Sequence, residues 1–222
     1  MVTVKELYDL DHTLAKDYLS QFEYPWQALA GISEMILKTG SVLPAEYRFQ
    51  DGNIWIHESA SIAPTASITG PCIIGRNTEV RPGAFIRGNA LVGDDCVVGN
   101  STELKNVILF DHVQVPHYNY VGDSILGYYS HMGAGSITSN VKSDKTLVVI
   151  KDHENHCSYE TGRKKVGALI GDHVEVGCSS VLNPGTVIGS NTNIYPLSSV
   201  RGVIPADSIF KKEDQIAKKE CR

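Results

Sequence analysis

An aliphatic residue recurs at every sixth position through the middle of the chain. The row comprises Ile56, Ile62, Ile68, Ile74, Val80, Ile86, Val92, Val98 and Leu104, with Phe110 in the next place. A second row with the same spacing comprises Ile170, Val176, Leu182, Ile188, Ile194 and Val200. A fixed period of this kind indicates stacked structural units, each of which is buried only by its neighbours.

A period of six excludes the simpler periodic structures. Apolar residues of an amphipathic helix recur with a spacing of 3.6, and those of a half-buried strand recur with a spacing of two. Six residues instead supply one short strand and one corner, and three such units close a triangular coil. A small residue stands two places before most members of the row and points to the same side of the strand. We therefore expect a mainly β protein, a parallel β-helix of hexapeptide repeats over residues 51–205.

The two flanks of the repeat differ from it. Residues 1–50 read as a helical cap over an open end of the prism, although an arm that docks a partner is the alternative. Thr3 and Glu6 form a possible capping box, and the helical run "WQALAGISEMILKTG" is expected to stop at Gly40. Its apolar residues lie on one face: Trp26, Leu29, Ile32, Ile36 and Leu37. Residues 206–222 form a charged C-terminal tail, which we expect to be a short exposed helix.

The sixfold row is interrupted in two places. After Phe110 the next step falls on Pro116, and the row resumes at Tyr120, Leu126, Met132 and Thr138. Residues 141–165 abandon the period altogether, which predicts a long extruded loop. Long loops in compact domains are more often functional than idle, and irregular places in a regular scaffold are where a site can be built.

Composition narrows the possible environment and partners. The chain has 222 residues, is 20% charged, carries a net charge of −5 and contains no run of apolar residues long enough for a membrane span. The negative charge argues against nucleic acid as a partner. The cysteines have no paired spacing, which is typical of a reducing compartment, and the charged start is unlike a signal peptide: Cys72, Cys96, Cys157, Cys178 and Cys221. We expect a cytoplasmic protein without a membrane partner.

Several motifs occur in a specific order. They are "RPGA" (81–84), "VGNSTELKN" (98–106), "HYNYVGDS" (117–124), "GAGSITSN" (133–140) and "IGDHVEVGCSSVL" (170–182). Together they resemble the C-terminal acetyltransferase domain of the bifunctional N-acetylglucosamine-1-phosphate uridyltransferase. A hexapeptide repeat alone implies only the fold, whereas the H-x-x-Y-x-G-D run, with E-x-K fourteen residues before the histidine, is a much narrower signal.

The resemblance implies a fold, a reaction and an assembly. It implies a left-handed parallel β-helix and a homotrimer whose active sites lie between subunits. It also implies transfer of an acetyl group from acetyl-CoA to the amine of glucosamine 1-phosphate. We therefore expect an acetyl-CoA-dependent acetyltransferase that acts on a sugar phosphate or a nucleotide sugar.

The implied chemistry needs a base of near-neutral pKa beside the attacking group. His117 matches the family's catalytic base, and Glu103 is expected to orient the imidazole and stabilise its cation. A corner histidine with satisfied hydrogen bonds is the structural alternative. Ala134 matches a position whose backbone N–H can hold the thioester oxygen as charge develops.

Binding positions are also carried over from the resemblance. Arg81 and Lys105 match the family's phosphate-binding pair, and both are cations, as a phosphate site requires. The remaining positions match residues that contact the sugar or its phosphate, or that line the coenzyme groove: Tyr120, Asn140 and Lys165 for the substrate, and Cys178 and Pro196 for acetyl-CoA.

This sequence departs from the family pattern at the acceptor end. The family's asparagine near the sugar is His131 here, and the tyrosine that follows Asn140 is Val141. The segment before Lys165 is an insertion. No Gly-rich nucleotide loop precedes the repeat, so we expect no nucleotidyltransferase activity of this chain. The acceptor sugar, and whether an amine or a hydroxyl is acylated, stay open.

Zinc chemistry is one alternative. The γ-class carbonic anhydrases are also hexapeptide trimers and hold zinc through two histidines five residues apart, the spacing of His112 and His117. The third ligand would fall near Arg76 or Asn77, neither of which suits zinc, unless His131 substitutes for it.

Two further alternatives are a metal site in the loop and a protein without catalytic activity. The loop segment "DHENHC" contains His153, His156 and Cys157, which is a loose metal-like cluster. Some hexapeptide domains serve as non-catalytic scaffold or regulatory subunits. The presence of His117, Glu103, Lys105 and Arg81 argues against a pure scaffold.

Overall fold

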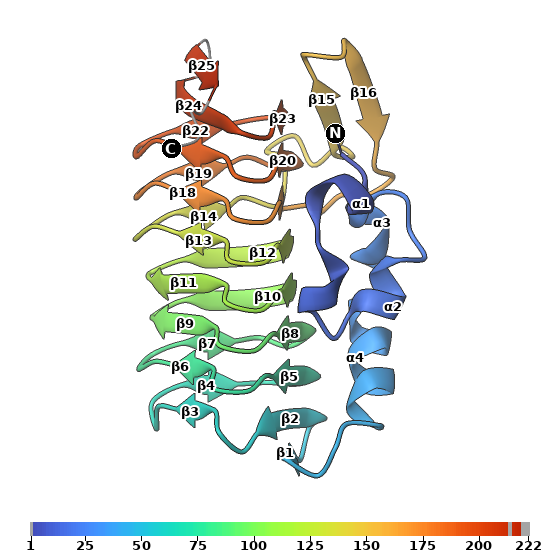
Figure 1. Cartoon of the computed structure of the whole chain (residues 1–222), viewed down its shortest axis with the longest axis vertical. Helices are drawn as coiled ribbons and strands as arrows, with labels where there is room; N and C mark the ends of the chain where they lie inside the picture. Colours follow the sequence, from blue (N-terminus) through green and yellow to red (C-terminus); the bar gives the residue numbers. More distant parts are fainter. Residues whose placement is uncertain (1, 213–214, 219–222) are drawn as a thin grey trace.

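The computed structural model describes residues 2–212 and 215–218. Its centre is a parallel β-helix with three faces, against whose side a group of short helices packs (Figure 1). A long stack of parallel strand pairs runs the length of the molecule, from β2 (Ile54–His57) to β24 (Ser208–Lys212). The predicted fold class, a mainly β helix of hexapeptide repeats with an N-terminal helical segment, is confirmed.

The first face contains β4 (Ser67–Ile68), β7 (Phe85–Ile86), the start of β10 (Glu103–Leu109), the start of β12 (Tyr120–Leu126), β14 (Ile137–Thr138), β19 (Val181–Leu182) and β22 (Ser199–Val200). The second face contains β2, β5 (Cys72–Ile74), β8 (Ala90–Val92), the ends of β10 and β12, β17 (Ala168–Ile170), β20 (Thr186–Ile188) and β23 (Val203–Ile204).

The third face contains β3 (Ser61–Ile62), β6 (Glu79–Val80), β9 (Val97–Asn100), β11 (Gln114–His117), β13 (His131–Met132), β18 (Glu175–Val176), β21 (Asn193–Ile194) and β24. At the two ends of the stack, β1 (Tyr47–Gln50) pairs with β2 and β25 (Gln215–Lys218) pairs with β24, both antiparallel. The tail therefore forms strands where it is described, and the predicted helix is wrong there; Cys221 lies outside the described residues.

The register shows where the sixfold count changes. Ile74 pairs with Val92, eighteen residues on, whereas Val92 pairs with Leu109 and Leu109 with Leu126, each seventeen residues on. Val98 pairs with Val115, and the strand continues through Pro116 to His117, which pairs with Asn100. The predicted break at Pro116 is therefore wrong. One residue is lost in each of two coils, on either side of the segment where we had expected a single break.

The missing residues are at the corner between the first and second faces. An ordinary coil turns this corner with two residues of positive φ, Gly88 (89°) and Asn89 (49°). The shortened coils turn it with a single such residue, Asn106 (56°) or Asp123 (48°). Asn and Asp adopt this conformation more readily than most residues, which is why the strands β10 and β12 run continuously around the corner.

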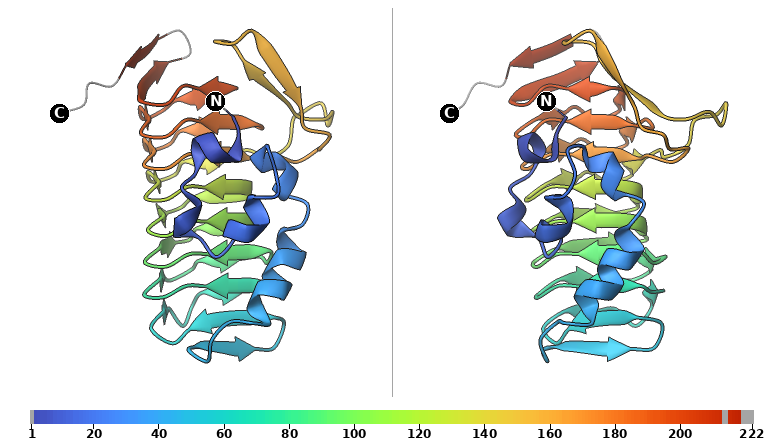
Figure 2. Two further views of the ribbon diagram at one scale, coloured as in Figure 1. Left: turned by 45° about the vertical axis from the view of Figure 1, so that its right-hand side comes forward. Right: turned by 90° about the vertical axis from the view of Figure 1, so that its right-hand side faces the viewer.

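The N-terminal helices lie along the second face and do not cap an end of the prism (Figures 1 and 2). They are α1 (Val4–Leu7), η1 (Leu10–His12), α2 (Lys16–Leu19), α3 (Pro25–Ala28) and α4 (Ile32–Gly40). The predicted capping box and the end at Gly40 are confirmed. The run predicted as one helix is broken between α3 and α4, and α4 packs across β5, β8 and β10.

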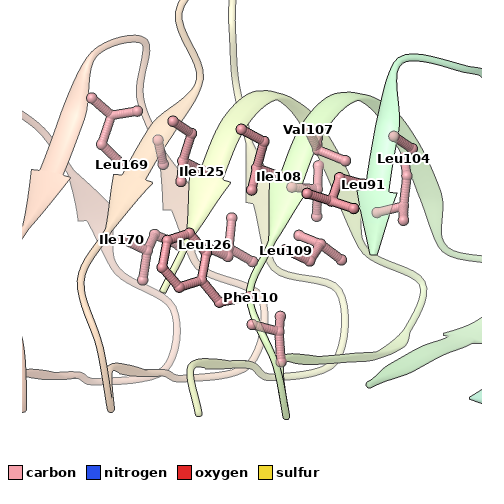
Figure 3. Close-up of a cluster of buried hydrophobic side chains, with 14 of the residues drawn as sticks. Leu91, Leu104, Val107, Ile108, Leu109, Phe110, Ile125, Leu126, Leu169 and Ile170 are labelled. Carbon is pink, nitrogen blue, oxygen red and sulfur yellow. The ribbon is translucent and has the colours of Figure 1, made fainter. Parts of the chain in front are cut away.

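The second face explains this placement. Most of its strands carry three consecutive apolar residues, as in β5, β8 and β17, although β12 and β20 have Ser124 and Thr186 in the first of the three places. The middle residue points away from the prism interior, yet these side chains have 0% exposure: Ile73, Leu91, Ile108, Ile125, Leu169 and Val187 (four are labelled in Figure 3). Burying each contributes about 1.5–3 kcal/mol, so this face needs a cover, and the helices provide it. A cap over the end would leave the whole row in water.

The predicted extruded loop is a hairpin. Its base is closed by a bridge between Val141 and Lys165, and its arms are β15 (Val149–Asp152) and β16 (Cys157–Glu160). Val148 and Ile150 are buried against Gly185, where a Cβ would lie 2.6 Å from Val148 Cγ1. Among the described residues no helix is long and apolar enough to cross a membrane.

Candidate functional site

One corner stacks four predicted site residues on successive coils. It lies between the third and first faces and carries His117, Ala134, Cys178 and Pro196; we call this column the open corner. The order follows from backbone hydrogen bonds between neighbouring coils. In each, the residue that follows one member of the column donates its N–H to the carbonyl of the member on the preceding coil: Gly135 N–H to His117 O (3.0 Å), Ser179 N–H to Ala134 O (2.8 Å) and Leu197 N–H to Cys178 O (2.9 Å). The predicted base and the predicted coenzyme positions therefore share one edge of the prism.

The local backbone explains the stacking. The residue after each of the four has positive φ: Tyr118 (51°), Gly135 (70°), Ser179 (56°) and Leu197 (60°). Positive φ is unusual for a tyrosine or a leucine, but it recurs at other corners of this prism, for example at His112 (60°) and Tyr129 (56°). Tyr118 and Leu197 are 65% and 82% exposed. The open corner thus presents exposed apolar side chains to solvent on the coil of His117 and on the coil of Pro196.

The His117 backbone is held firmly while its ring stays free. Its N–H donates to Asn119 Oδ1 (3.0 Å), and the buried Asn119 amide donates to the carbonyls of Gly133 (2.9 Å) and Ser136 (3.1 Å). Asn119, which sequence reasoning missed, therefore ties His117 to the turn that contains Ala134. Within residues 2–212 and 215–218, the imidazole has no hydrogen bond or ion pair. Within these ranges no bond to the ring supports the alternative of a corner histidine with satisfied hydrogen bonds.

Glu103 does not hold the His117 ring within this chain. Its carboxylate lies 2.7 Å from the Arg87 guanidinium, on the first face. That guanidinium also lies over the Phe85 ring, 5.8 Å from its centre. The expected orienting role of Glu103 is therefore unformed in the single chain.

A second group of predicted residues meets around a carboxylate that was not predicted. Asp123 accepts hydrogen bonds from Asn106 Nδ2 (2.9 Å) and Asn140 Nδ2 (2.6 Å), and its Oδ2 lies 3.4 Å from Lys105 Nζ. Asn140 Nδ2 also donates to the Tyr120 hydroxyl (3.2 Å). We call these five residues the closed corner. The structure thus brings the predicted Lys105, Tyr120 and Asn140 together.

Asp123 holds the closed corner together because it is almost fully buried, with 4% exposure. Burial raises the pKa of Tyr120, and the charges of Asp123 and Glu103 raise it further. Gly122 leaves room for this arrangement, since a Cβ there would lie 2.5 Å from the Tyr120 hydroxyl oxygen. The signal for Asp123 was present in the sequence as the G-D pair of "HYNYVGDS".

The other predicted residues lie apart from the closed corner. Arg81 pairs with Glu79 (2.8 Å) beside the third face. His131 Nδ1 lies 2.8 Å from Glu175 Oε2, also on the third face. Lys165 is exposed at the base of the hairpin.

The metal alternatives have little geometric support. His112 lies at a different corner from His117, where its ring stacks on Tyr129 at 4.4 Å. His153, His156 and Cys157 are on the hairpin and are exposed. In the part of the chain that the structure describes, no three His, Cys, Asp or Glu side chains gather as a metal site would require.

Most of the chain is similar in sequence to known proteins. Over 202 residues the chain is 33% identical to the bifunctional protein GlmU of Methanococcus maripaludis, covering 90% of this chain and 48% of that protein. The predicted resemblance is confirmed. A bifunctional sugar-1-phosphate nucleotidylyltransferase/acetyltransferase of Sulfurisphaera tokodaii is 32% identical over 227 residues, 93% of this chain and 54% of that protein. The chain thus spans about half the length of these two relatives.

Two further comparisons cover part of the chain. Residues 68–153 match the family model described as the GMPPB C-terminal domain. The acetyltransferase domain of PglB from Neisseria gonorrhoeae, solved with acetyl coenzyme A, has a TM-score of 0.40 at 15% identity over 75% of this chain and 58% of that chain. A putative acetyltransferase from Bacillus cereus has a TM-score of 0.43 at 19% identity over 77% and 80%. The fold assignment rests on the strand register of this chain itself.

Proposed function

We propose that this protein is an acetyl-CoA-dependent acetyltransferase that acts on a sugar phosphate or a nucleotide sugar. The observation that carries the proposal is the open corner, where the His117 imidazole has no partner among the described residues and stands one coil from Ala134, on the same edge as Cys178 and Pro196. Similarity to proteins named as bifunctional GlmU and as a sugar-1-phosphate nucleotidylyltransferase/acetyltransferase supports it.

The open corner suits an acetyl thioester. Its exposed surface is formed by the apolar side chains of Tyr118 and Leu197 together with the exposed Cys178. In the described part of the chain, the Ala134 backbone N–H has no hydrogen-bond acceptor, although the Ala134 carbonyl is paired. A free N–H beside a reacting carbonyl is what an oxyanion site needs. Acetyl-CoA, when bound, supplies the acetyl group as a thioester.

Different residues of the chain then transfer the proton and stabilise the developing charge. His117 accepts a proton at an imidazole nitrogen from the amine or hydroxyl of the acceptor as that group forms its bond to the acetyl carbon. His117 returns the proton to the sulfur as the carbon–sulfur bond breaks. The Ala134 N–H donates to the carbonyl oxygen while that oxygen carries negative charge. Asn119 keeps the two groups at a fixed separation because it bonds to both segments.

The closed corner supplies groups that can bind the acceptor. Lys105 is partly exposed, with a loose 3.4 Å contact to Asp123, so a phosphate can share its ammonium group. Tyr120 and Asn140 offer a hydroxyl and an amide for sugar hydroxyls. Arg81 and Lys165 lie farther away, and we propose that they also bind the phosphate of the acceptor.

The proposal includes a homotrimer with sites between subunits, in the cytoplasm. The free His117 ring and the Glu103 carboxylate held by Arg87 both fit a site that a second copy completes. His131, on the third face, would then approach the acceptor from across the interface.

The test is thiol release from acetyl-CoA with a panel of amino-sugar phosphates and UDP-sugars as acceptors. The matched variants are His117→Asn and His112→Asn, because His112 lies five residues away on the same coil but at another corner. Turnover lost only in His117→Asn supports the proposed base. Turnover lost equally in both variants contradicts it and favours the zinc alternative. Absence of both turnover and coenzyme A binding favours the scaffold alternative.

A further inference from the structure

A pocket of about 630 Å³ lies where the hairpin meets the last coils of the β-helix. In Figure 2 the hairpin β15–β16 rises beside β23 to β25 at this end. The lining is apolar at its floor and basic at its wall: Val149, Pro184, Gly202, Val203, Ile204, Phe210 and Ile216, with Lys142, Lys151, His153 and Arg201. None of its lining residues belongs to the open or the closed corner, although Arg201 and Gly202 turn the same edge, between β22 and β23, that Asp123 turns on an earlier coil.

The pocket has a firm construction. Ile204 and Phe210 are interior residues of the last coil, each 3% exposed, and they close the prism at this end. The hairpin is held tightly against the corner at Gly202, where a Cβ would lie 2.5 Å from the Lys151 carbonyl oxygen. A larger residue at Gly202 would push the hairpin away. The wall and floor are therefore fixed relative to one another.

The charge in the pocket is opposite to that of the whole protein. The chain carries a net charge of −5, yet among the described residues none that lines this pocket is acidic. Lys142 is engaged by Thr146 (2.6 Å) and Asp144 (3.4 Å). Within the described ranges, the side chains of Lys151 and Arg201 have no hydrogen bond or ion pair. Two free cations above an apolar floor favour an anion, and Arg offers a planar fork that matches phosphate oxygens.

We propose that this pocket binds an organic anion, namely a phosphorylated nucleoside, as a ligand separate from the acetyl transfer site. The phosphate groups lie against Lys151 and Arg201, and the planar base lies on the aliphatic and Phe210 floor. The volume is in the range of ordinary small-molecule sites, about 300–1,000 Å³. The inference does not depend on the proposed acetyltransferase activity.

The test is calorimetric titration of the full chain with uridine diphosphate and, separately, with uridine. Arg201→Gln and Lys151→Gln should each weaken diphosphate binding by about tenfold or more, since a hydrogen bond to a charged group contributes that much. Lys145→Gln, in the same loop but outside the pocket lining, is the matched control and should bind as the wild type does. Uridine should bind much more weakly, and added salt should weaken diphosphate binding.

Two results would overturn the inference. One is the absence of diphosphate binding by a wild-type protein whose circular dichroism shows a folded β structure. The other is binding that survives in Arg201→Gln and Lys151→Gln but disappears in His117→Asn or Lys105→Gln, which would place the nucleotide at the acetyl transfer site. A failure of acetyl transfer with intact binding at the pocket would count against the proposed function only.

Discussion

The open and closed corners are built by the same repeat and lie at the two edges of the first face, yet their polar groups are arranged differently. At the closed corner Asp123 is bonded to two amides and contacts an ammonium group. At the open corner, within the part of the chain that the structure describes, the His117 ring and the Ala134 N–H have no partner. Satisfied buried polar groups stabilise a fold, whereas an unsatisfied group at a surface is available for a ligand.

Removal of the His117 imidazole should have the largest effect and should act on catalysis alone. We expect His117→Asn to lower the acetyl transfer rate by about 10²–10⁴-fold, the usual contribution of a general base. The free energy of unfolding should change by less than about 0.5 kcal/mol, because His117 is exposed and its ring has no hydrogen bond within the described residues. Steady-state kinetics and urea unfolding measure the two effects. A large loss of stability would make His117 a structural residue.

Removal of the Asp123 carboxylate should have the opposite signature. Asp123→Ala removes one acceptor from the buried Asn106 amide and one from the partly buried Asn140 amide, and it leaves Lys105 without its counter-ion. We expect it to lower the free energy of unfolding by about 1–3 kcal/mol. Asp95→Ala is the control, because Asp95 has a similar φ of 55° and a side chain that is 40% exposed. Urea unfolding of both variants checks the expectation. Equal losses would mean that backbone strain, rather than the network, explains the effect.

Lys105 contacts Asp123 in the closed corner, and its side chain is also partly exposed, so that it can bind the proposed acceptor. Lys105→Met should raise the KM for a phosphorylated acceptor by about tenfold, with kcat less affected, because a charged hydrogen bond to the bound substrate is removed. The exposed Lys164→Met is the control. If instead stability falls and the KM is unchanged, then Lys105 serves Asp123 only.

The alkaline stability of the closed corner provides the smallest test. Burial raises the pKa of Tyr120 above its ordinary value of 10.0, so the folded chain holds the phenol proton more tightly than the unfolded chain does. This contribution to stability is full below pH 10 and is lost as the pH rises through the folded pKa. Tyr120→Phe should lose less stability than the wild type when urea unfolding is compared below and above pH 10. Tyr118→Phe, at the open corner, should follow the wild type.

The sequence alone predicted the prism and most residues of the site because local spacing carries this information. A sixfold aliphatic row can be buried by only a few arrangements, and a capping box and a terminal glycine act within a few residues. The resemblance in "HYNYVGDS" and "GAGSITSN" identified positions that the fold then gathers into two corners. The apolar triplets of the second face, such as Ala168–Ile170, also indicate in the sequence that this face is covered on its outer side.

Only the tertiary structure determines which side chains of the site bond to one another. Whether Glu103 meets His117 or Arg87, and whether Asp123 is exposed or buried, depends on which coils are adjacent and on one residue missing at Asn106 and again at Asp123. Likewise, the helices lie along the second face because its outward row must be covered, which no pattern within residues 1–50 reveals. Spacing along a chain determines which side chains share a face. Contacts between coils depend on register and corner length, which become defined only when the whole stack forms.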